Sequence, residues 1–300
     1  MLTNGRTAAT AESSPFASYG RTRVLAFVNE KGGVAKTTSC VNLSAALAGL
    51  GYRVLCLDMD PQANASLGLG VPADKIQHEP HALLTNSRFR LDRAIVPTAV
   101  DGVDLIPSNA GLAQCNKALV PEVARETRLR GKIAAFLQRG EGPRYDFMLI
   151  DCAPALDLLT VNSLTAATDL VVPVQARFYS LQGMAAVADT VATLCQQLGA
   201  EVRLLGVLVT MYNRRAAVDH AILDLLKNKM TRTFGDRLFE TVVPLSAAVS
   251  ETEALGPPLV VRWPNSPAAR AYRSVAREML RRMGYRTKEH AISGDGAATG

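Results

Sequence analysis

The chain has few cysteines and histidines, and neither is spaced to bind a metal. Five cysteines are scattered over 300 residues, mostly in apolar runs, so we interpret them as small core side chains of a protein in a reducing compartment. They are Cys40, Cys56, Cys115, Cys152 and Cys195. Of four histidines, only His78 and His81 lie close together, in a polar loop around Pro80. The sequence also lacks a Gly-x-Ser-x-Gly motif. These absences argue against structural zinc, an iron–sulfur cluster and a serine hydrolase.

Apolar runs long enough to cross a membrane are also missing. Hydrophobic residues still make up 48% of the chain and charged residues 20%, which is enough to bury a large core and argues against a disordered protein. Residues 1–22 are dominated by Ser, Thr, Gly and Ala, without the apolar centre of a secretion signal. We expect a disordered extension over 1–22, one domain over 23–284 and a flexible tail over 285–300.

The most informative segment runs from Asn29 to Thr38 and reads Asn-Glu-Lys-Gly-Gly-Val-Ala-Lys-Thr-Thr. The apolar run 24–28 before it predicts a buried strand, and the pattern over 39–50 predicts a helix. A glycine-rich loop between strand and helix is typical of phosphate binding, because backbone N–H groups and the helix N-terminus surround the anion. Lys36 would reach the β- and γ-phosphates, and the Thr37 hydroxyl would ligate Mg²⁺. A glycine-rich turn without a ligand is the alternative.

The loop departs from the common pattern G-x-x-x-x-G-K-[ST], because Glu30 and Ala35 replace glycines and Lys31 is an additional lysine. Lys-Gly-Gly-x-x-Lys-Thr resembles the deviant Walker A loop of the ParA/MinD family of ATPases. The resemblance implies ATP and Mg²⁺ as cofactors and a sandwich homodimer in which Lys31 reaches the partner's nucleotide. An alanine at position 35 requires a negative φ there. The implied nucleotide contacts in the loop are Lys31, Gly32, Gly33, Val34, Ala35, Lys36, Thr37 and Thr38.

Two further strands are expected to end in acidic residues. The run Asp58-Met-Asp60-Pro-Gln-x-Asn64 follows one strand and resembles the family's Walker A′ motif, in which the second aspartate, here Asp60, positions the attacking water. Asp151 ends the other and matches a Walker B aspartate that holds Mg²⁺. An ordinary Asp-Pro turn is the alternative for the first. The expected catalytic residues are Lys31, Lys36 and Asp60, and the expected metal site is Thr37, Asp60 and Asp151.

Strand and helix patterns alternate along the chain and predict an α/β fold. We expect a three-layer, mostly parallel twisted sheet with helices on both faces and the motifs at its carboxyl edge. Further strands are predicted at 102–107, 169–174, 203–210 and 238–243. Helices are predicted at 110–140, interrupted by Pro121, and at 157–167, 181–199, 216–230, 246–255 and 266–283. Family likeness after residue 206 implies that Asn213 and Pro244 lie near the base of the nucleotide.

The net charge of +6 equals the excess of basic residues over 262–290. At helical spacing, four arginines of this region share one stripe, and apolar side chains such as Tyr272 and Met279 fall opposite. Non-specific binding of double-stranded DNA phosphates is the favoured interpretation. A solvated helix face and an amphipathic membrane anchor are the alternatives, and a polar chain end argues against the anchor. The candidate DNA contacts are Arg215, Arg262, Arg270, Arg273, Arg277 and Arg281.

These features together predict a cytoplasmic, nucleoid-associated partition ATPase of the ParA/Soj type. The resemblance implies weak intrinsic hydrolysis, a ParB-type partner that stimulates it, and DNA binding by the ATP dimer alone. A MinD-like or cargo-positioning ATPase is the alternative within the family. A metabolic P-loop enzyme that acts on a small carboxylate is the alternative outside it.

Overall fold

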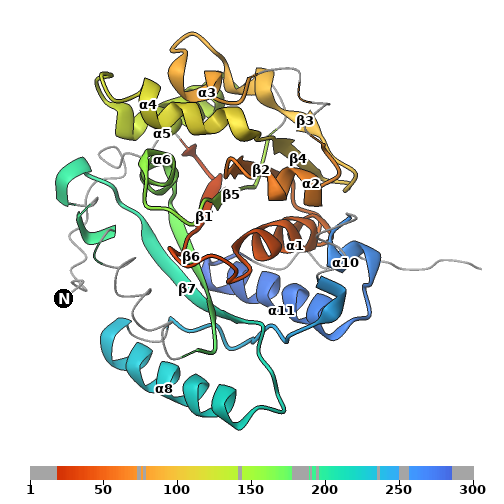
Figure 1. The fold of residues 1–300 in the computed structure, drawn as a ribbon. Helices are drawn as coiled ribbons and strands as arrows, with labels where there is room; N and C mark the ends of the chain where they lie inside the picture. Colours follow the sequence, from red (N-terminus) through yellow and green to blue (C-terminus); the bar gives the residue numbers. More distant parts are fainter. Residues whose placement is uncertain are drawn as a thin grey trace, which may run out of the picture.

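The computed structural model describes residues 19–72, 76, 79–140, 144–177, 189, 191–193, 196–234, 237–249 and 257–285. Its centre is a seven-stranded sheet in the order β3-β4-β2-β5-β1-β6-β7 (Figure 1). All neighbouring strands are parallel except β3 and β4, so the predicted mostly parallel sheet is confirmed. The strands are β1 (Arg23–Phe27), β2 (Val54–Met59), β3 (Val96–Pro97), β4 (Val103–Ile106), β5 (Phe147–Cys152), β6 (Asp169–Gln175) and β7 (Arg203–Thr210).

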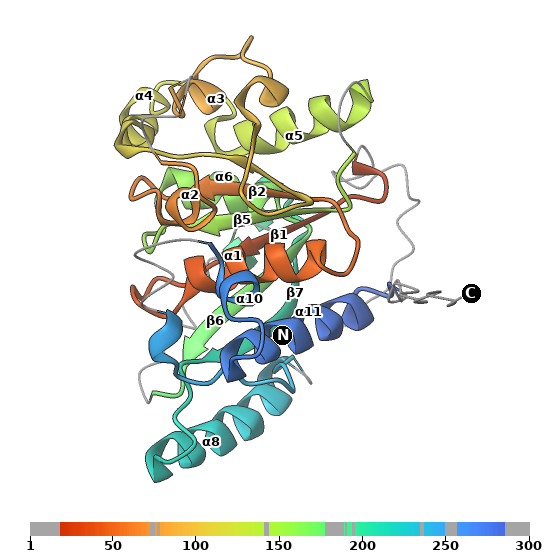
Figure 2. The ribbon, with the colours of Figure 1, turned by 90° about the vertical axis from the view of Figure 1, so that its right-hand side faces the viewer.

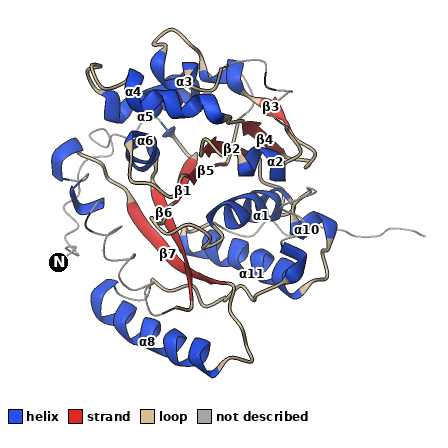
Figure 3. Ribbon diagram, in the orientation of Figure 1, coloured by secondary structure: helices blue, strands red, loops and turns tan. Residues whose placement is uncertain are grey.

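Helices cover both faces of this sheet, as Figure 3 shows. The central strands β2 and β5 are buried at every residue, which is why their sequences are nearly continuous apolar runs rather than alternating ones. The α-helices are α1 (Lys36–Ala48), α2 (Asn64–Gly68), α3 (Ala82–Thr85), α4 (Cys115–Ala118), α5 (Arg128–Arg139), α6 (Leu158–Ala166), α8 (Ala217–Phe234), α10 (Leu259–Arg262) and α11 (Pro267–Arg282). Short 3₁₀ turns are η3 (Leu91–Ala94), η4 (Ala110–Gln114) and η5 (Arg125–Thr127).

Two apolar cores lie on the two faces, because successive strand residues point to opposite sides. Val24 and Ala26 of β1 belong to the core that includes residues of α5 and α6. Leu25 and Phe27 belong to the core that α1 and α11 complete. Figure 2 shows α5 and α11 well separated, with the sheet between them. The two helices therefore present their outer surfaces on opposite sides of the molecule.

The segment predicted as a strand at 238–243 is not one. It runs beside β7, but only isolated bridges form, from Val207 to Leu238 and from Tyr212 to Pro244. Between these bridges, the backbone N–H groups of Glu240 and Thr241 donate to the buried carboxylate of Glu278, at 2.9 and 3.2 Å. A side chain from α11 thus takes donors that a regular ladder would have used.

The helical predictions hold in part. The break expected near Pro121 is present, since α4 ends at Ala118 and α5 begins at Arg128. The helix predicted at 246–255 is described only as a helical start at 247–249, and the rest lies outside the described residues. Much of the helix predicted at 181–199, including its beginning, also lies outside them.

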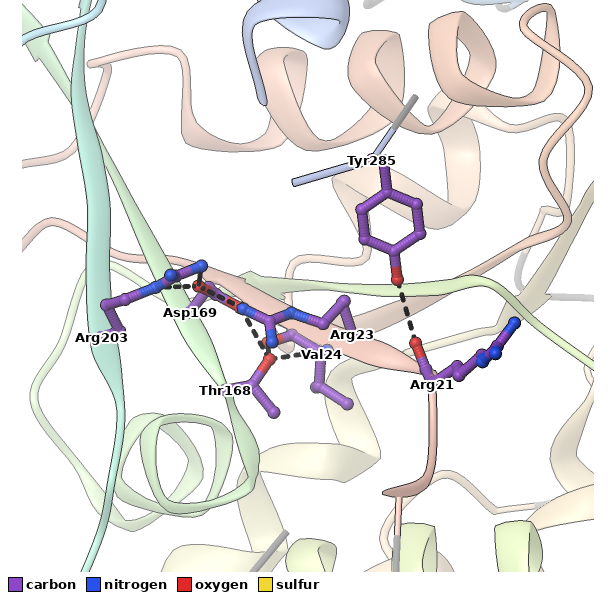
Figure 4. A network of polar contacts seen from close by, with 7 residues as sticks. All are labelled: Arg21, Arg23, Val24, Thr168, Asp169, Arg203 and Tyr285. Atoms are coloured by element: carbon purple, nitrogen blue, oxygen red, sulfur yellow. Dashed lines mark hydrogen bonds and ion pairs between the residues drawn. The ribbon is translucent and has the colours of Figure 1, made fainter. Parts of the chain in front are cut away.

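The packed domain extends a few residues beyond both of its predicted ends, 23 and 284. Tyr19 is buried and its hydroxyl donates to the Ala166 carbonyl at 3.2 Å. At the other end, the Tyr285 hydroxyl donates to the Arg21 carbonyl at 3.0 Å (Figure 4). The packed region therefore includes residues 19–22 and Tyr285, which were expected in the extension and the tail. Residues 1–18 and 286–300 lie outside the described residues.

An ion-pair cluster closes the amino-terminal edge of the sheet. Asp169 at the start of β6 is fully buried, and its carboxylate lies 2.8 Å from Arg23 and 2.7 Å from Arg203, which begin the two neighbouring strands (Figure 4). Thr168 adds a hydrogen bond from its hydroxyl at 2.8 Å. A buried charge with this many partners is compensated, so it has a structural role at the edge away from the sequence motifs.

Four cysteines are described, and all four are buried and free, as predicted for small core residues: Cys40, Cys56, Cys115 and Cys152. Cys195 lies outside the described residues. Within the described part of the chain, no helix has both the length and the hydropathy needed to cross a membrane.

Candidate nucleotide site

A cleft of about 400 Å³ opens at the carboxyl edge of the sheet, where the sequence motifs converge. The loop 29–35 after β1, the turn 60–63 after β2 and the first turns of α1 form most of its wall. Parallel sheets bind ligands at this edge, where loops leave the strands and helix N-termini point toward the ligand. Its lining residues are Gly32, Gly33, Ala35, Lys36, Thr37, Thr38, Val41, Asn42, Asp60, Gln62, Asn64, Gly68, Pro154, Met211 and Pro258.

The loop itself has the backbone of an anion site, with one correction to the sequence expectation. Ala35 adopts φ +61°, in the left-handed region, and not the negative φ that an alanine there was expected to require. The chain must turn left-handed immediately before α1 for that helix to begin at Lys36. An L-residue in this conformation costs about 1–2 kcal/mol, so the surrounding contacts must hold it. Gly33 also has positive φ, at +70°, without that cost.

Three side chains that the sequence analysis did not single out as site residues hold the loop in place. The Asn29 amide donates to the Pro173 carbonyl at 2.8 Å and accepts from the Lys31 N–H at 3.0 Å. The Gln175 amide donates to the Gly33 carbonyl at 2.7 Å, and the Thr210 hydroxyl donates to the Val34 carbonyl at 3.0 Å. The carboxyl ends of β6 and β7 thereby fix two of the loop's carbonyls, those of Gly33 and Val34.

The two lysines of the loop have different environments. Lys36 is 7% exposed and its ammonium donates to the Lys31 carbonyl at 3.1 Å. Burial lowers the pKa of Lys36, while the negative charges of Asp151 and Asp60 oppose the shift. Lys31 is exposed, and it is not among the residues that line the cleft. Lys36 therefore serves this chain's own cleft, whereas the Lys31 side chain extends from its rim.

Asp151 is a buried carboxylate whose charge is only partly compensated. It is fully buried at the end of β5, and neither oxygen accepts a well-formed hydrogen bond within the described chain. Burial raises the pKa of Asp151 well above its ordinary value, and the charge of Asp58 raises it further. The nearby Thr37 hydroxyl and Lys36 ammonium lower it less. An orphaned carboxylate beside a phosphate loop fits a cation that also binds phosphate.

This donor set suits Mg²⁺ rather than a protein-caged metal. The described residues contain no group of three or more His, Cys, Asp or Glu that could hold an ion. Mg²⁺ usually keeps several waters and binds through one or two carboxylates together with substrate phosphates. Thr37, Asp60 and Asp151, all predicted from the sequence, are brought to this place.

Asp58 and Asp60 have separate tasks, although both lie at the carboxyl end of β2. Asp58 is 2% exposed, and one of its oxygens accepts from the Ser66 N–H at 2.8 Å and from the Ser66 hydroxyl at 2.7 Å. Burial raises the pKa of Asp58 to about 6. The Asp60 N–H donates to Asp58 at 3.2 Å, so Asp58 orients the turn while the Asp60 side chain lines the cleft.

Asn213 and Pro244, which were expected near the base of the nucleotide, are not among the residues that line the cleft. The Asn213 side chain accepts from the Arg215 N–H at 3.0 Å, and its own N–H donates to Asp219 at 2.8 Å, an arrangement that shapes the start of α8. Pro244 forms its bridge with Tyr212. Met211 and Pro258 line the cleft instead. The contact of Asn213 and Pro244 with the base of the nucleotide remains a prediction.

The predicted DNA-binding arginines differ in how their guanidinium groups are used. Arg270 donates to the Asn265 carbonyl, and Arg273 donates to the carbonyls of Val260 and Pro264. The Arg281 guanidinium lies 3.8 Å from the Glu240 carboxylate, with both side chains largely exposed. Arg262 stacks over Trp263 with 4.8 Å to the ring centre.

Arg277 and Arg215 form no side-chain hydrogen bond or ion pair within the described chain, and both are exposed. The apolar face opposite the stripe is buried as predicted, with Tyr272 and Met279 at 1% and 0% exposure. The structure therefore confirms the amphipathic helix. It leaves fewer unengaged arginines than the sequence alone suggests.

Comparison with known proteins agrees with this geometry. A family model described as an AAA domain matches residues 22–204. The chain is 36% identical over 257 residues to the sporulation initiation inhibitor protein Soj of Bacillus subtilis, across 86% of this chain and 98% of Soj. The chain belongs to the ParA/MinD family of P-loop ATPases. It is also 36% identical over 260 residues to the chromosome partitioning protein ParA of Caulobacter vibrioides, across 87% of this chain and 94% of that protein.

A solved structure outside partition shares the fold of this ParA/MinD-type chain. Cobyrinic acid a,c-diamide synthase from Mycobacterium smegmatis, with bound ADP and magnesium, has a TM-score of 0.73 and 31% sequence identity. The match covers 89% of this chain and 97% of the synthase. The ParA/MinD architecture is thus found with more than one activity, and the function must be argued from the site.

Several cleft residues of this family member were visible in the sequence but were not singled out. Gln62 and Asn64 belong to the Asp-x-Asp-Pro-Gln-x-Asn run, and Met211 follows β7. Asn42 lies in the second turn of α1, and its side chain accepts from the Val260 N–H at 3.0 Å. Pro258 had no signal, because it reaches the cleft from a distant segment.

Proposed function

We propose that the chain is an ATP-dependent DNA partition ATPase. In this proposal, ATP and Mg²⁺ bring two copies together face to face, and the dimer binds double-stranded DNA without sequence preference. Hydrolysis, weak in the protein alone and stimulated by a ParB-type partner, then releases it. The protein would act in the cytoplasm, associated with the nucleoid. The sequence similarity to Soj and to ParA supports this assignment.

The observation that carries the proposal is the contrast between Lys36 and Lys31. Both belong to one loop, and the backbone of Lys31 is fixed by its bonds to Asn29 and Lys36. Its side chain is nevertheless exposed at the rim. A fixed backbone with an outward cation suits a residue that completes the site of a second copy, as an arginine finger does in other P-loop enzymes.

Within one subunit, the described residues divide the work. Lys36 and the loop N–H groups would hold the phosphates, and Thr37 with Asp151 would hold Mg²⁺, which when bound supplies neutralisation of charge on the transferring phosphoryl group. The Asp60 carboxylate lines the cleft, where it can orient the attacking water. Asp58 keeps the Asp60 backbone in place. Because Lys31 arrives only in a dimer, the isolated subunit lacks a stabilising cation and should hydrolyse slowly.

DNA binding is proposed for exposed arginines that the fold leaves available. Arg277 and Arg215 meet this condition, and Arg281 is only weakly engaged. One subunit offers few phosphate contacts, while a dimer doubles them, which gives a large gain in affinity. This is the physical reason to expect ATP-dependent binding.

The test is binding to a random-sequence duplex with ATP, with ADP and without nucleotide, over a salt series. We expect tight, salt-sensitive binding with ATP alone, loss of nucleotide binding in Lys36→Ala, and normal ATP binding without dimerisation in Lys31→Ala. Sizing by light scattering separates these two variants. DNA binding by Lys36→Ala that matched the unmodified protein would rule out the nucleotide switch.

The structural similarity to cobyrinic acid a,c-diamide synthase supports a second candidate, a metabolic enzyme that activates a small carboxylate. Turnover stimulated by such a substrate and indifferent to DNA would favour it. ATP-dependent dimers that bind no DNA would instead favour a MinD-like or cargo-positioning role.

A further inference from the structure

A second cleft, of about 500 Å³, lies on the face of the sheet opposite α1 and α11. Helix α5 forms one side, and the segment 87–91 with the turn at 123–127 forms the other. It is as large as the nucleotide cleft and shares no lining residue with it. Five of its lining residues are basic: Arg88, Arg90, Arg128, Lys132 and Arg139.

Positive charge in this cleft exceeds what neighbouring acids neutralise. Arg90 pairs with Asp92 at 3.0 Å, and Arg128 pairs with Glu122 at 2.6 Å. The other three cations have no acidic ion-pair partner among the described residues. Burial lowers the pKa of Lys132, and the charges of Arg128 and Arg139 lower it further, as expected for a crowd of like charges.

Two of these cations are available to a ligand. The Lys132 ammonium uses its three donors on the carbonyls of Asn86, Ser87 and Phe89, at 2.8, 2.9 and 2.6 Å. Arg88 and Arg139 are exposed at the mouth, and their guanidinium groups form no hydrogen bond or ion pair within the described chain. The Nε of Arg128 is buried and also lacks a partner. Donors thus remain both at the mouth and in the wall.

The α5 side of the cleft, here called its floor, is open to solvent at an exposed glycine that the helix does not need. Gly131 lies inside α5, and a Cβ built on it would meet no atom within 4 Å. Neither a positive φ nor close packing therefore requires glycine, which is a poor helix former. Its absent side chain leaves room beside Lys132 and Arg128.

The beginning of α5 adds to the positive potential. Acidic residues normally favour the first turn of a helix, but the first turn of α5 contains none and carries Arg128 and Arg130 instead. Arg130 is not among the residues that line the cleft, so it adds to the positive potential but supplies no donor to the cleft. The N-terminus is the positive end of the helix dipole, and arginines there add to its positive charge. Beside an open cleft, this combined positive potential favours the binding of an anion.

We propose that this α5 cleft binds a compact polyanion, a small molecule bearing two or more phosphate groups, independently of the phosphate loop. Guanidinium groups form bidentate hydrogen bonds with phosphate, and the concave shape suits a ligand that enters between Arg88 and Arg139. A DNA duplex presents its phosphates on a convex surface, which fits an exposed helix better than this cavity. The site goes beyond the proposed partition function and does not depend on it.

The test uses inorganic tripolyphosphate, titrated by calorimetry into intact protein in magnesium-free buffer. Lys36→Ala is the starting protein, because it removes the phosphate-loop site and leaves the α5 cleft unchanged. We expect one remaining site. Arg88→Gln with Arg139→Gln should weaken it at least about tenfold, as for the loss of two charged hydrogen bonds.

Two controls make the result decisive. Gly131→Leu fills the floor without changing charge and should also weaken binding at least about tenfold, since leucine is a good helix former and meets open space. Arg270→Gln with Arg277→Gln removes the same charge from α11 and should have no effect. The proposal fails if Lys36→Ala shows no remaining site, if both arginine pairs weaken binding equally, or if duplex DNA displaces tripolyphosphate at equal phosphate concentration.

Discussion

Helices α5 and α11 are both basic, lie on opposite faces of the sheet, and each commits one cation to three backbone carbonyls. On α11, Arg282 donates to the carbonyls of Leu205, Arg237 and Leu238. On α5, Lys132 does the same for the segment 86–89. The α11 cation is paired with a buried acid, Glu278, at 2.8 Å, whereas Lys132 has no such pair within the described chain. A basic helix can therefore serve the fold, a ligand or both, and charge alone does not distinguish them.

The surroundings of Arg282 show how far a basic residue can be committed to structure. Its guanidinium lies 4.4 Å from the Phe239 ring centre, and Gly206 has no room for a side chain because Phe239 and Arg282 occupy that space. The arginine thus fastens the segment 237–241 to β7. Arg277, one turn earlier, makes no such contact.

The strongest test of this contrast is Arg282→Ala. It leaves the Glu278 carboxylate buried and unpaired, so we expect a loss of about 3–5 kcal/mol in the free energy of unfolding. Urea denaturation measures it. Arg277→Ala is the matched control and should stay within about 0.5 kcal/mol of the unmodified protein. A loss below about 1 kcal/mol for Arg282→Ala would contradict the structural role.

Lys132→Met tests the corresponding cation on α5. Methionine keeps much of the aliphatic stem but removes three donors from backbone carbonyls, of which only the bond to Phe89 is partly buried, and we expect a loss of about 1–2 kcal/mol. We expect a smaller loss than for Arg282→Ala because Lys132→Met leaves no buried acid unpaired. If Lys132→Met cost more than Arg282→Ala, the distinction between the two helices would be wrong.

The third test compares how much the outer surfaces of α11 and α5 contribute to DNA binding. Removing one phosphate-binding arginine should lower the slope of log affinity against log salt by about 0.9. Because each subunit of the proposed dimer loses one arginine, we expect about twice this change, about 1.8, for Arg277→Ala in the ATP-bound protein. Arg139→Ala removes the same charge from the opposite face and should leave the slope unchanged. Equal changes in both variants would mean that net charge, not the α11 surface, governs binding.

The smallest effect is expected for Gly131→Ala. Since the position is helical and open, alanine should raise the free energy of unfolding by about 0.5–1 kcal/mol. Gly206→Ala is the contrasting control and should be destabilising, because its Cβ would lie 2.7 Å from Phe239. A destabilised Gly131→Ala would mean that the α5 floor is packed.

The parallel sheet and the phosphate-loop residues could be predicted from the sequence alone. Both depend on local patterns: apolar runs that end in Asp58 or Asp151, and a loop whose residues are adjacent in the chain. The burial of one face of α11 was also predictable, because helical spacing alone separates Tyr272 from Arg277. Local spacing fixes which residues share a strand end or a helix face.

Which polar groups have partners could not be predicted, because it depends on how distant segments pack. The tertiary structure placed Ala35 at positive φ, and it turned the predicted strand at 238–243 into a segment bound to Glu278. It also left Asp151 without a partner while surrounding Asp169 with arginines. The two carboxylates look alike in sequence, since each lies in an apolar strand. Their partners come from distant segments, and a distant contact depends on how the sheet and helices pack.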